Sequence, residues 1–194
     1  MKKINKILIG THNLGKFREI SYLLSKKIEK ISPVSLKIKS PKETGKTYEE
    51  NSKLKASYFA KKSGLISISD DSGLSIACLK GKPGIHSARF AQKCGGFKKA
   101  MQKIINLVNN KKNTKAFFAC SLTVYYSKKK IITVIGKING NISSKILGKN
   151  GFGYDSIFIP QNYKKTFGQM KKKEKIKIDH RSVAFKKLKS KIKI

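Results

Sequence analysis

Two long runs of β-forming residues constrain the fold of this chain more than any other feature. The runs cover residues 115–126 and 130–138, are rich in β-branched and aromatic residues, and are separated only by Ser127, Lys128 and Lys129. Such a pattern predicts a long β-hairpin. Because extended and helical patterns alternate before this point and strands cluster from it onward, the sequence predicts a mixed α/β protein with a substantial antiparallel part.

The spacing of apolar residues places the other elements. We expect further strands at residues 6–10, 34–38, 65–69 and 154–159, of which those at 6–10 and 65–69 are expected to be buried. Apolar residues at helical spacing predict helices at residues 16–25, 47–62, 97–108 and 179–190. Thr47 and Glu50 have the spacing of a capping box at the start of the second helix, and Gly64 is suited to its end.

Length and composition favour one globular domain. The chain has 194 residues, of which 39% are hydrophobic, and it contains no apolar stretch long enough to span a membrane. The charged N-terminus and the short apolar run after it are not typical of a signal peptide. Cys78, Cys94 and Cys120 are widely spaced and odd in number, which indicates reduced thiols rather than a disulfide framework or a zinc site. We therefore expect a cytoplasmic protein with no membrane partner.

The charge balance is extreme, with 45 Lys and Arg against 10 Asp and Glu and a formal net charge of +35. Such a charge suggests a basic nucleic-acid-binding module, which is the main alternative to an enzyme. However, only Arg18, Arg89 and Arg181 are arginines, whereas proteins that read phosphates and base edges favour the bidentate guanidinium. The lysines are spread along the whole chain, so a coding bias explains them better, and we expect no specific nucleic-acid partner.

Two of the few acidic residues, Asp70 and Asp71, stand side by side after the predicted strand at 65–69 and before Ser72 and Gly73. Adjacent carboxylates at the end of a buried strand repel each other and lose hydration unless a positive charge compensates them. A divalent cation is the simplest compensator, and magnesium needs only one or two protein carboxylates when substrate phosphates complete its shell. The alternative is an Asx turn that binds no ligand.

Three weaker signals accompany this acidic turn. The loop at 11–16 joins a predicted strand to a predicted helix, where backbone N–H groups and Lys16 can hold a phosphate, although the Walker A spacing is absent. The segment 151–155 combines glycines with a ring on which a purine could stack and a carboxylate that could accept its hydrogen bonds. His180 and Arg181 begin the last helix, where both can donate to an electronegative ligand. Each signal also has a purely structural explanation, as a βα turn, a β-bulge and an ordinary helix start.

The order of these motifs resembles one family along nearly the full chain. The segments that carry the resemblance are residues 11–19 (its T-x-N-x-x-K-x-x-E start), 43–51 with Lys55, 70–74 with 81–90, 151–158, and 180–181. The family is that of the inosine triphosphate pyrophosphatases, and in particular the bacterial Ham1 proteins that act on non-canonical purine nucleotides. Its motifs are weak singly, but their occurrence in the right order is specific.

The resemblance implies an elongated mixed sheet with flanking helices, the fold type of inosine triphosphatase and Maf proteins. It implies a single domain over residues 1–194 with two lobes and an active-site cleft between them. It also implies a homodimer that hydrolyses ITP, dITP and XTP with Mg²⁺ to the monophosphate and pyrophosphate, which keeps deaminated purines out of DNA and RNA. A related nucleotide pyrophosphatase with a different base preference is the remaining alternative.

The resemblance assigns the catalytic role to Asp71, which is expected to orient or deprotonate the attacking water and to contact Mg²⁺. Glu43, or else Glu50, is expected to complete the metal site. Lys42 precedes Glu43 where bacterial relatives commonly have a second acid, and this departure could weaken the affinity for Mg²⁺.

The resemblance also implies a set of substrate-binding residues. They are Thr11, His12, Asn13, Leu14, Gly15, Lys16, Lys55, Ser72, Phe152, Gly153, Tyr154, Asp155, Lys175, His180 and Arg181. The residues up to Ser72 are expected to hold the triphosphate, and the ring of Phe152 is expected to stack on the base. Lys175, His180 and Arg181 are expected to donate to the base, which favours a 6-oxo group over the 6-amino group of adenine. His12 stands where relatives usually have a small residue, so it either crowds the phosphates or adds a donor.

Overall fold

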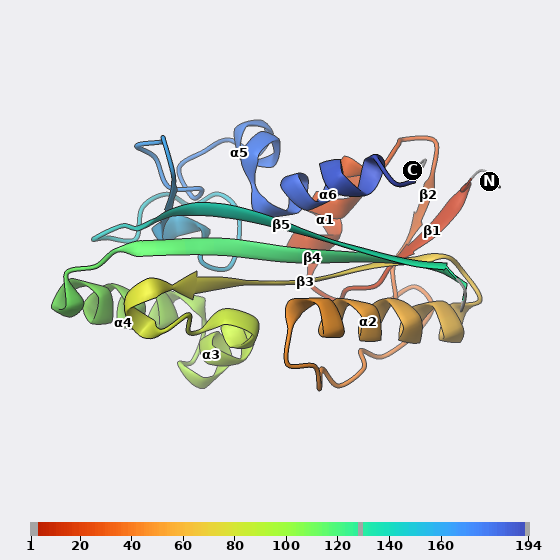
Figure 1. The fold of residues 1–194 in the computed structure, drawn as a ribbon, viewed down its shortest axis with the longest axis horizontal. Helices are drawn as coiled ribbons and strands as arrows, with labels where there is room; N and C mark the ends of the chain where they lie inside the picture. The colour runs from red at the N-terminus through yellow and green to blue at the C-terminus, as the bar shows by residue number, and fades with distance from the viewer. Residues whose placement is uncertain (1–3, 128–129, 193–194) are drawn as a thin grey trace. The chain divides into compact units, whose positions relative to one another are not determined.

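The computed structural model describes residues 4–127 and 130–192, and its strands form one six-stranded sheet (Figure 1). The sheet order is β2-β1-β3-β4-β5-β6, with the strands β1 Lys6–Ile9, β2 Glu29–Ile31, β3 Ser67–Ile76, β4 Lys115–Ser127, β5 Lys130–Ile142 and β6 Phe158–Pro160. β1 is parallel to β2 and to β3, with Leu8 opposite Ile31 in one pair and opposite Ser67 in the other. β5 is antiparallel to β6. The mixed sheet confirms the predicted α/β class.

Helices flank the sheet on both faces (Figure 1). The α-helices are α1 Leu14–Leu23, α2 Tyr48–Ser63, α3 Ser87–Lys93, α4 Phe97–Lys111, α5 Lys172–Ile178 and α6 His180–Lys189, and the 3₁₀-helices are η1 Ala77–Leu79, η2 Gly84–His86 and η3 Asp155–Ile157. The start of α2 is capped by Thr47, whose Oγ1 accepts a hydrogen bond from the backbone N–H of Glu50 at 3.1 Å. Its end lies at Gly64, where φ is 71°, a conformation that favours glycine. No helix in the described residues is long and apolar enough to cross a membrane.

The chain separates into two compact units. Unit 1 comprises residues up to 71, residues 120–136 and residues from 181 onward, and unit 2 comprises residues 72–119 and 137–180. β3, β4 and β5 each contribute residues to both units. Each unit has its own hydrophobic core.

The core of unit 1 follows from the alternation of side chains along β4. Cys120, Leu122 and Val124 point into the core beneath α1 and α6. The intervening Ser121 and Thr123 face α2, where the Oγ of Ser52 lies 2.8 Å from each of their hydroxyl oxygens. In Figure 1, α1 and α6 accordingly cover one face of these strands and α2 covers the other.

The core of unit 2 is built around aromatic rings. Phe118 of β4 packs edge-on against Phe158 of β6 at a centroid distance of 4.7 Å, and Phe167 packs against both rings. Leu74 of β3 and Ile104 of α4 are fully buried in the same cluster. Offset and edge-on ring pairs of this kind stabilise a core beyond their burial alone.

The strand predicted at residues 34–38 is wrong, because this segment forms turns and the strand lies earlier, at Glu29–Ile31. The backbone N–H of Ile38 donates to the carbonyl of Pro33 at 2.9 Å, and Lys37 has a φ of 54°. The apolar side chain of Val34 is 63% exposed, so it does not mark a buried strand. Apolar residues alone therefore misled the sequence prediction here.

The acidic turn predicted at residues 70–73 is also wrong. β3 continues without interruption from Ser67 through Asp70 and Asp71 to Ile76. The strand can carry two adjacent carboxylates because each has its own polar partners, as described below.

Two smaller differences and one agreement complete the comparison with the sequence. The segment predicted as a strand at 154–159 begins as η3, and β6 covers only Phe158–Pro160. A short helix, α5, precedes the predicted last helix. The two long β-runs are strands that neighbour each other in the sheet, while Lys128 and Lys129 of their predicted connection lie outside the described residues.

Candidate active site

The two adjacent carboxylates of β3 point to opposite faces of the sheet, as neighbouring side chains of a strand must. Asp70 meets Lys16 of α1 and Arg181 of α6 on one face. Asp71 meets Asn51 and Lys55 of α2 on the other. The strand thus gives each carboxylate its own direct partners, while the charges of Lys16 and Lys55 act on both.

Asp70 is fully buried and bound by cations. Its Oδ2 lies 2.9 Å from Nη2 of Arg181 and 3.2 Å from Nζ of Lys16. Burial alone would raise the pKa of Asp70, but the charges of Lys16 and Arg181 outweigh it and hold that pKa well below its ordinary value. Nη1 of Arg181 binds Oε2 of Glu19, a second buried carboxylate. This group is a buried ion network in which Arg181 joins two acids.

Asp71 has a different electrostatic character. Its Oδ2 accepts a hydrogen bond from Nδ2 of Asn51 at 3.1 Å, and its Oδ1 lies 3.7 Å from Nζ of Lys55. Burial raises the pKa of Asp71 above its ordinary value; Lys55 opposes this shift and Glu43 adds to it. A buried carboxylate with a raised pKa is better suited to accept a proton than an ordinary surface carboxylate.

Glu43 is linked to Asp71 through Lys55. Nζ of Lys55 lies 2.5 Å from Oε1 of Glu43. Although burial lowers the pKa of Lys55, the neighbouring carboxylates raise it on balance, so the ammonium stays charged. The ammonium of Lys55 therefore lies near the carboxylates of both Glu43 and Asp71.

The fit of a divalent cation to these residues can be judged from the donor set. Asp71 and Glu43 are oxygen donors of the type that Mg²⁺ prefers, and two carboxylates suffice when phosphates supply other ligands. Among the described residues, no cluster of three or more His, Cys, Asp and Glu could hold a metal by itself. Glu50 is engaged elsewhere, since its Oε2 accepts from the backbone N–H of Lys46 at 2.7 Å next to the start of α2. Glu43, which shares Lys55 with Asp71, stays the predicted second ligand, and Glu50 stays the alternative.

The first loop is arranged by local hydrogen bonds at the start of α1. Oγ1 of Thr11 accepts from the backbone N–H of Asn13, and Oδ1 of Asn13 accepts from that of Lys16 at 3.0 Å. The side chain of Leu14 is 67% exposed. Nδ1 of His12 lies 2.6 Å from Oγ of Ser40, so His12 contacts a second loop. The start of a helix attracts anions, and Lys16 in its first turn strengthens this attraction.

In unit 2, Asp155 and Lys175 form a buried pair beside Phe152. Nζ of Lys175 lies 2.6 Å from Oδ2 of Asp155 and 4.8 Å from the centroid of the Phe152 ring. The same carboxylate oxygen accepts from the backbone N–H of Phe152 at 2.8 Å. Gly151 has a φ of 76°, and a Cβ there would lie 2.1 Å from Oδ2 of Asp155. Glycine is therefore required for the loop to approach this carboxylate closely.

Two other predicted residues of unit 2 are built into its core. The hydroxyl of Tyr154 donates to the carbonyl of Ser87 at 2.8 Å, and burial raises the pKa of this tyrosine above its ordinary value. The ring of His180 stacks on Phe118 at a centroid distance of 4.7 Å and an interplanar angle of 11°. Both side chains are almost fully buried. Gly153 and Ser72 are half-buried.

The predicted site residues are divided between the two units. Lys16, Lys55, Asp71 and Glu43 belong to unit 1, whereas Phe152, Asp155, Lys175 and His180 belong to unit 2. Arg181, predicted to donate to a base, is bound in unit 1 by Glu19 and Asp70. Its contact with a base stays a prediction.

Sequence reasoning gave no role to Glu19 and Asn51, which contact Arg181 and Asp71 respectively. Both lie within the segments that carry the resemblance, at residues 11–19 and 43–51. Glu19 is only 7% exposed on a helix of a lysine-rich protein. The sequence did hold a signal for Glu19, because an acid on the apolar face of a predicted helix is expected to be buried and therefore to need a partner.

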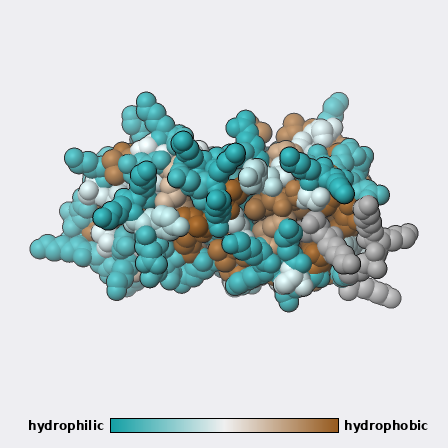
Figure 2. Space-filling model, turned by 90° about the horizontal axis from the view of Figure 1, so that it is seen from above, coloured by the Kyte–Doolittle hydropathy of each residue, from teal (hydrophilic) through white to brown (hydrophobic). Residues whose placement is uncertain are grey.

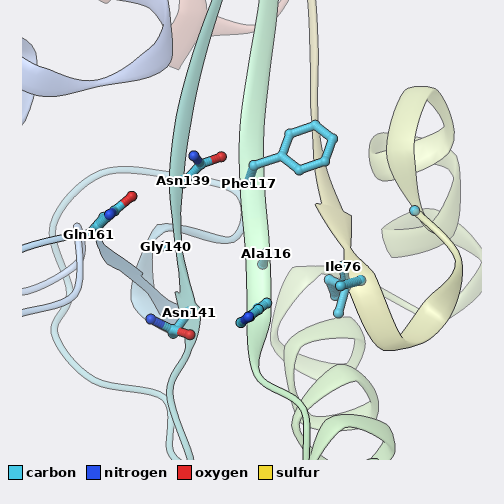
Figure 3. Close-up of a pocket in the computed structure, with 10 residues that line it drawn as sticks. Ile76, Ala116, Phe117, Asn139, Gly140, Asn141 and Gln161 are labelled. Atoms are coloured by element: carbon cyan, nitrogen blue, oxygen red, sulfur yellow. The ribbon is translucent and has the colours of Figure 1, made fainter.

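A cavity of about 480 Å³ lies elsewhere in unit 2 and is shown in Figure 3. Its lining includes Phe117 of β4, Asn139 and Asn141 of β5, and Gln161 after β6. None of the predicted site residues is among its described lining residues. We therefore do not assign the substrate to it.

Comparison with known proteins gives a consistent result. The model of the Ham1 family matches residues 7–191. A protein of Dictyoglomus thermophilum named dITP/XTP pyrophosphatase is 42% identical over 193 residues, which cover 94% of this chain and 92% of that protein. A protein of Caulobacter vibrioides with the same name is 38% identical and covers 95% of this chain and 96% of its own length. The structure of a HAM1 protein from Coxiella burnetii superposes with a TM-score of 0.84 at 31% identity, covering 96% of this chain and 98% of that one.

Proposed function

This chain belongs to the Ham1 family, and from that premise we propose that it hydrolyses non-canonical purine nucleoside triphosphates, such as dITP, ITP and XTP, to the monophosphate and pyrophosphate. The observation that carries the proposal is the buried carboxylate of Asp71, whose pKa is raised and which lies beside Lys55 and Glu43. The physiological role would be to keep deaminated purines out of DNA and RNA.

Asp71 acts as the general base in this proposal. Its carboxylate accepts a proton from the attacking water, the water oxygen forms a bond to phosphorus, and the bond between the α- and β-phosphates breaks with pyrophosphate as the leaving group. Asn51 fixes the orientation of Asp71 by its hydrogen bond, and Lys55 supplies a positive charge near the reacting phosphate. A divalent ion, which we propose to be Mg²⁺ held by Asp71 and Glu43, would neutralise phosphate charge when bound.

The start of α1 binds the triphosphate in this proposal. The backbone N–H groups of residues 11–15 and the ammonium of Lys16 supply the positive end of the helix. The side chain of Lys16 is 17% exposed while it contacts Asp70, and in this proposal its ammonium also meets the triphosphate. His12 adds a ring nitrogen next to this loop.

The base is recognised in unit 2. Phe152 supplies a face for stacking, and Lys175 next to it donates to the oxygen at position 6 of hypoxanthine or xanthine. Asp155 holds Lys175 in place beside the ring of Phe152. Adenine presents an amino group at position 6, which would oppose one donor with another.

Pyrophosphate release from dITP, XTP, dGTP and dATP tests the proposed function. With Mg²⁺ present we expect dITP and XTP to react faster than dATP by roughly 10⁴-fold, because a buried donor left unpaired by the wrong base is costly. dGTP shares the 6-oxo group, so its rate reports on position 2 of the base. Removal of divalent ions with EDTA is expected to abolish release. Equal rates with dITP and dATP would contradict the recognition by Lys175.

Replacement of Gly151 by alanine tests the base site separately from the phosphate chemistry. The new Cβ would collide with Asp155 and displace the carboxylate that holds Lys175. We expect the KM for dITP to rise by roughly tenfold or more, with a smaller change in kcat, because binding of the base is lost. Gly64→Ala is the matched control. The φ of Gly64 is 71°, close to the 76° of Gly151, but nothing lies within 4 Å of the added Cβ. An unchanged KM in Gly151→Ala would remove Asp155 from the base site.

We also propose that the enzyme is a cytoplasmic homodimer without a specific nucleic-acid partner. The three cysteines are free in the structure, as expected for a reducing compartment. In Figure 2, hydrophilic side chains are spread over the face shown rather than collected in one stripe. Analytical ultracentrifugation measures the dimer directly.

A further inference from the structure

A cavity of about 590 Å³ in unit 2 is lined by residues of η1, η2, α3 and α4 and of the turn between η1 and η2, and none of the residues proposed to bind the nucleotide is among its described lining residues. Its size falls in the range of cavities that hold small organic molecules, roughly 300 to 1,000 Å³. We propose that this cavity binds an amphiphilic anion, meaning a molecule with a linear apolar body and a carboxylate or phosphate head group.

The floor of the cavity is apolar. The residues that form it are Cys78, Leu79, Pro83, Phe90, Ile104 and Leu107. Ile104 is fully buried, whereas Phe90 and Leu107 are half-buried and leave apolar surface open to the cavity. A hydrocarbon chain bound there would remove apolar surface of both the protein and the ligand from water, which favours binding. No Ser, Thr, Asn or Gln side chain lines the described part of the cavity.

The rim of the cavity is cationic. Its cations are Lys80, Lys82, Arg89, Lys93 and Lys111, and the imidazole of His86 lies among them. All of these rim side chains are exposed, and none of the described lining residues is acidic. Nζ of Lys103 lies a further 6.0 Å from the centroid of Phe90. So many like charges around one opening repel each other, and an anionic head group relieves that repulsion.

Arg89 makes this arrangement informative, because it is one of only three arginines in the chain and the proposed nucleotide chemistry gives it no role. A guanidinium can bind a carboxylate or phosphate with two parallel hydrogen bonds, which a lysine cannot. Its place beside an apolar hollow fits the head group of a bound amphiphile.

Other occupants fit the cavity less well. A second copy of the chain packed around a two-fold axis would bring the same cations against each other. A bilayer surface is bound by apolar groups that project from a protein, whereas here they lie in a hollow. The amphiphilic anion is the occupant that satisfies both the floor and the rim.

Calorimetric titration of the whole protein with decanoate tests the proposal. Acetate serves as the head group alone and decanol as the apolar body alone. At physiological salt we expect decanoate to bind at least about tenfold more tightly than either, because only decanoate satisfies the floor and the rim together. The measurement needs no nucleotide, so its outcome is independent of the proposed activity.

Two variants and two matched controls locate the site. Leu107→Glu places a charge on the floor, and the double variant Lys93→Glu/Lys111→Glu reverses two charges of the rim. We expect each to weaken decanoate binding by about tenfold. Leu36→Glu changes an exposed leucine of unit 1, and Lys61→Glu/Lys189→Glu changes the same net charge at two other helix C-termini. We expect each control to weaken binding by less than about twofold.

Three results would overturn the proposal. The first is binding of acetate or decanol as tight as that of decanoate. The second is an equal loss of affinity in the Lys61/Lys189 control and in the rim variant, which would assign binding to the overall charge. The third is a change of oligomeric state in Leu107→Glu with unchanged decanoate binding, which would assign the floor to contact with a second copy.

Discussion

Asp71→Asn is expected to lose about 10³-fold in kcat for dITP, the loss typical of removing a general base. The amide keeps the size of the side chain and can still accept the hydrogen bond from Asn51, but it cannot take a proton from water. Steady-state pyrophosphate release measures the loss. The acid limb of the pH–rate profile of the native enzyme should also follow the raised pKa of Asp71, because activity requires its ionised form.

The same substitution is expected not to lower stability. Folding raises the pKa of Asp71, so the ionised carboxylate is less favourable in the folded state than in the unfolded chain at neutral pH. A neutral amide removes that cost, and Lys55 keeps Glu43 as its partner at 2.5 Å. Urea unfolding should therefore give Asp71→Asn a free energy of unfolding equal to or above that of the native protein. An inactive variant that is also strongly destabilised would mean that Asp71 is a structural residue.

Two substitutions by glutamine test which acid completes the metal site. Glu43→Gln should lower activity and weaken the response to Mg²⁺, because Glu43 shares Lys55 with Asp71. Glu50→Gln should leave activity close to native, since its side chain still accepts from the backbone of Lys46 next to the start of α2. The reverse ranking would place Glu50 at the metal.

Asp70→Asn is expected to show the opposite behaviour, with a loss of about 3 kcal/mol or more in the free energy of unfolding. The carboxylate is fully buried between Lys16 and Arg181, and its removal leaves buried cations with one acid fewer. Urea unfolding at neutral pH measures the loss. The matched control is Glu29→Gln, which breaks the exposed ion pair with Lys6 at 3.1 Å and should change stability by less than about 1 kcal/mol.

The pH dependence of stability shows whether the lost charge causes the destabilisation of Asp70→Asn. Folding lowers the pKa of Asp70, so its contribution is fully present above the pKa of the unfolded chain, about 4. The contribution is lost as the pH falls further, toward the lowered pKa of the folded state. The difference in stability between the native protein and Asp70→Asn should therefore shrink below about pH 4. A difference that stays constant with pH would show that lost packing, and not lost charge, destabilises the variant.

Some helices and strands could be predicted from the sequence and others could not. Thr47, Glu50 and Gly64 marked the ends of α2 correctly because capping depends on residues close together in the sequence. The spacing of apolar residues placed α4 correctly for the same reason. The strand predicted at 34–38 failed because exposed Val34 and its neighbours lie in turns, and burial is not a local property.

The chemistry of the acidic pair shows what local reasoning misses. The sequence indicated that Asp70 and Asp71 needed compensation, and a divalent cation is the simplest local answer. In the structure, β3 passes through the pair and turns each carboxylate to a different face, where residues distant in sequence meet it. Arg181 reaches Asp70 from 111 positions away along the chain. Glu19, the second acid bound by Arg181, had no assigned role until the fold showed this contact.

The sequence by itself determined the α/β class, the ends of the best-capped helices and the motif order that identifies the family, since all three are recorded in short segments of chain. The resemblance in sequence had already assigned the base to Asp71, and only the tertiary structure placed Lys16 and Arg181 against Asp70 as its ion partners. Two neighbouring residues of the same type differ in pKa because the sheet gives them different surroundings: strong cations on one face, and a mixed environment of amide, ammonium and carboxylate on the other.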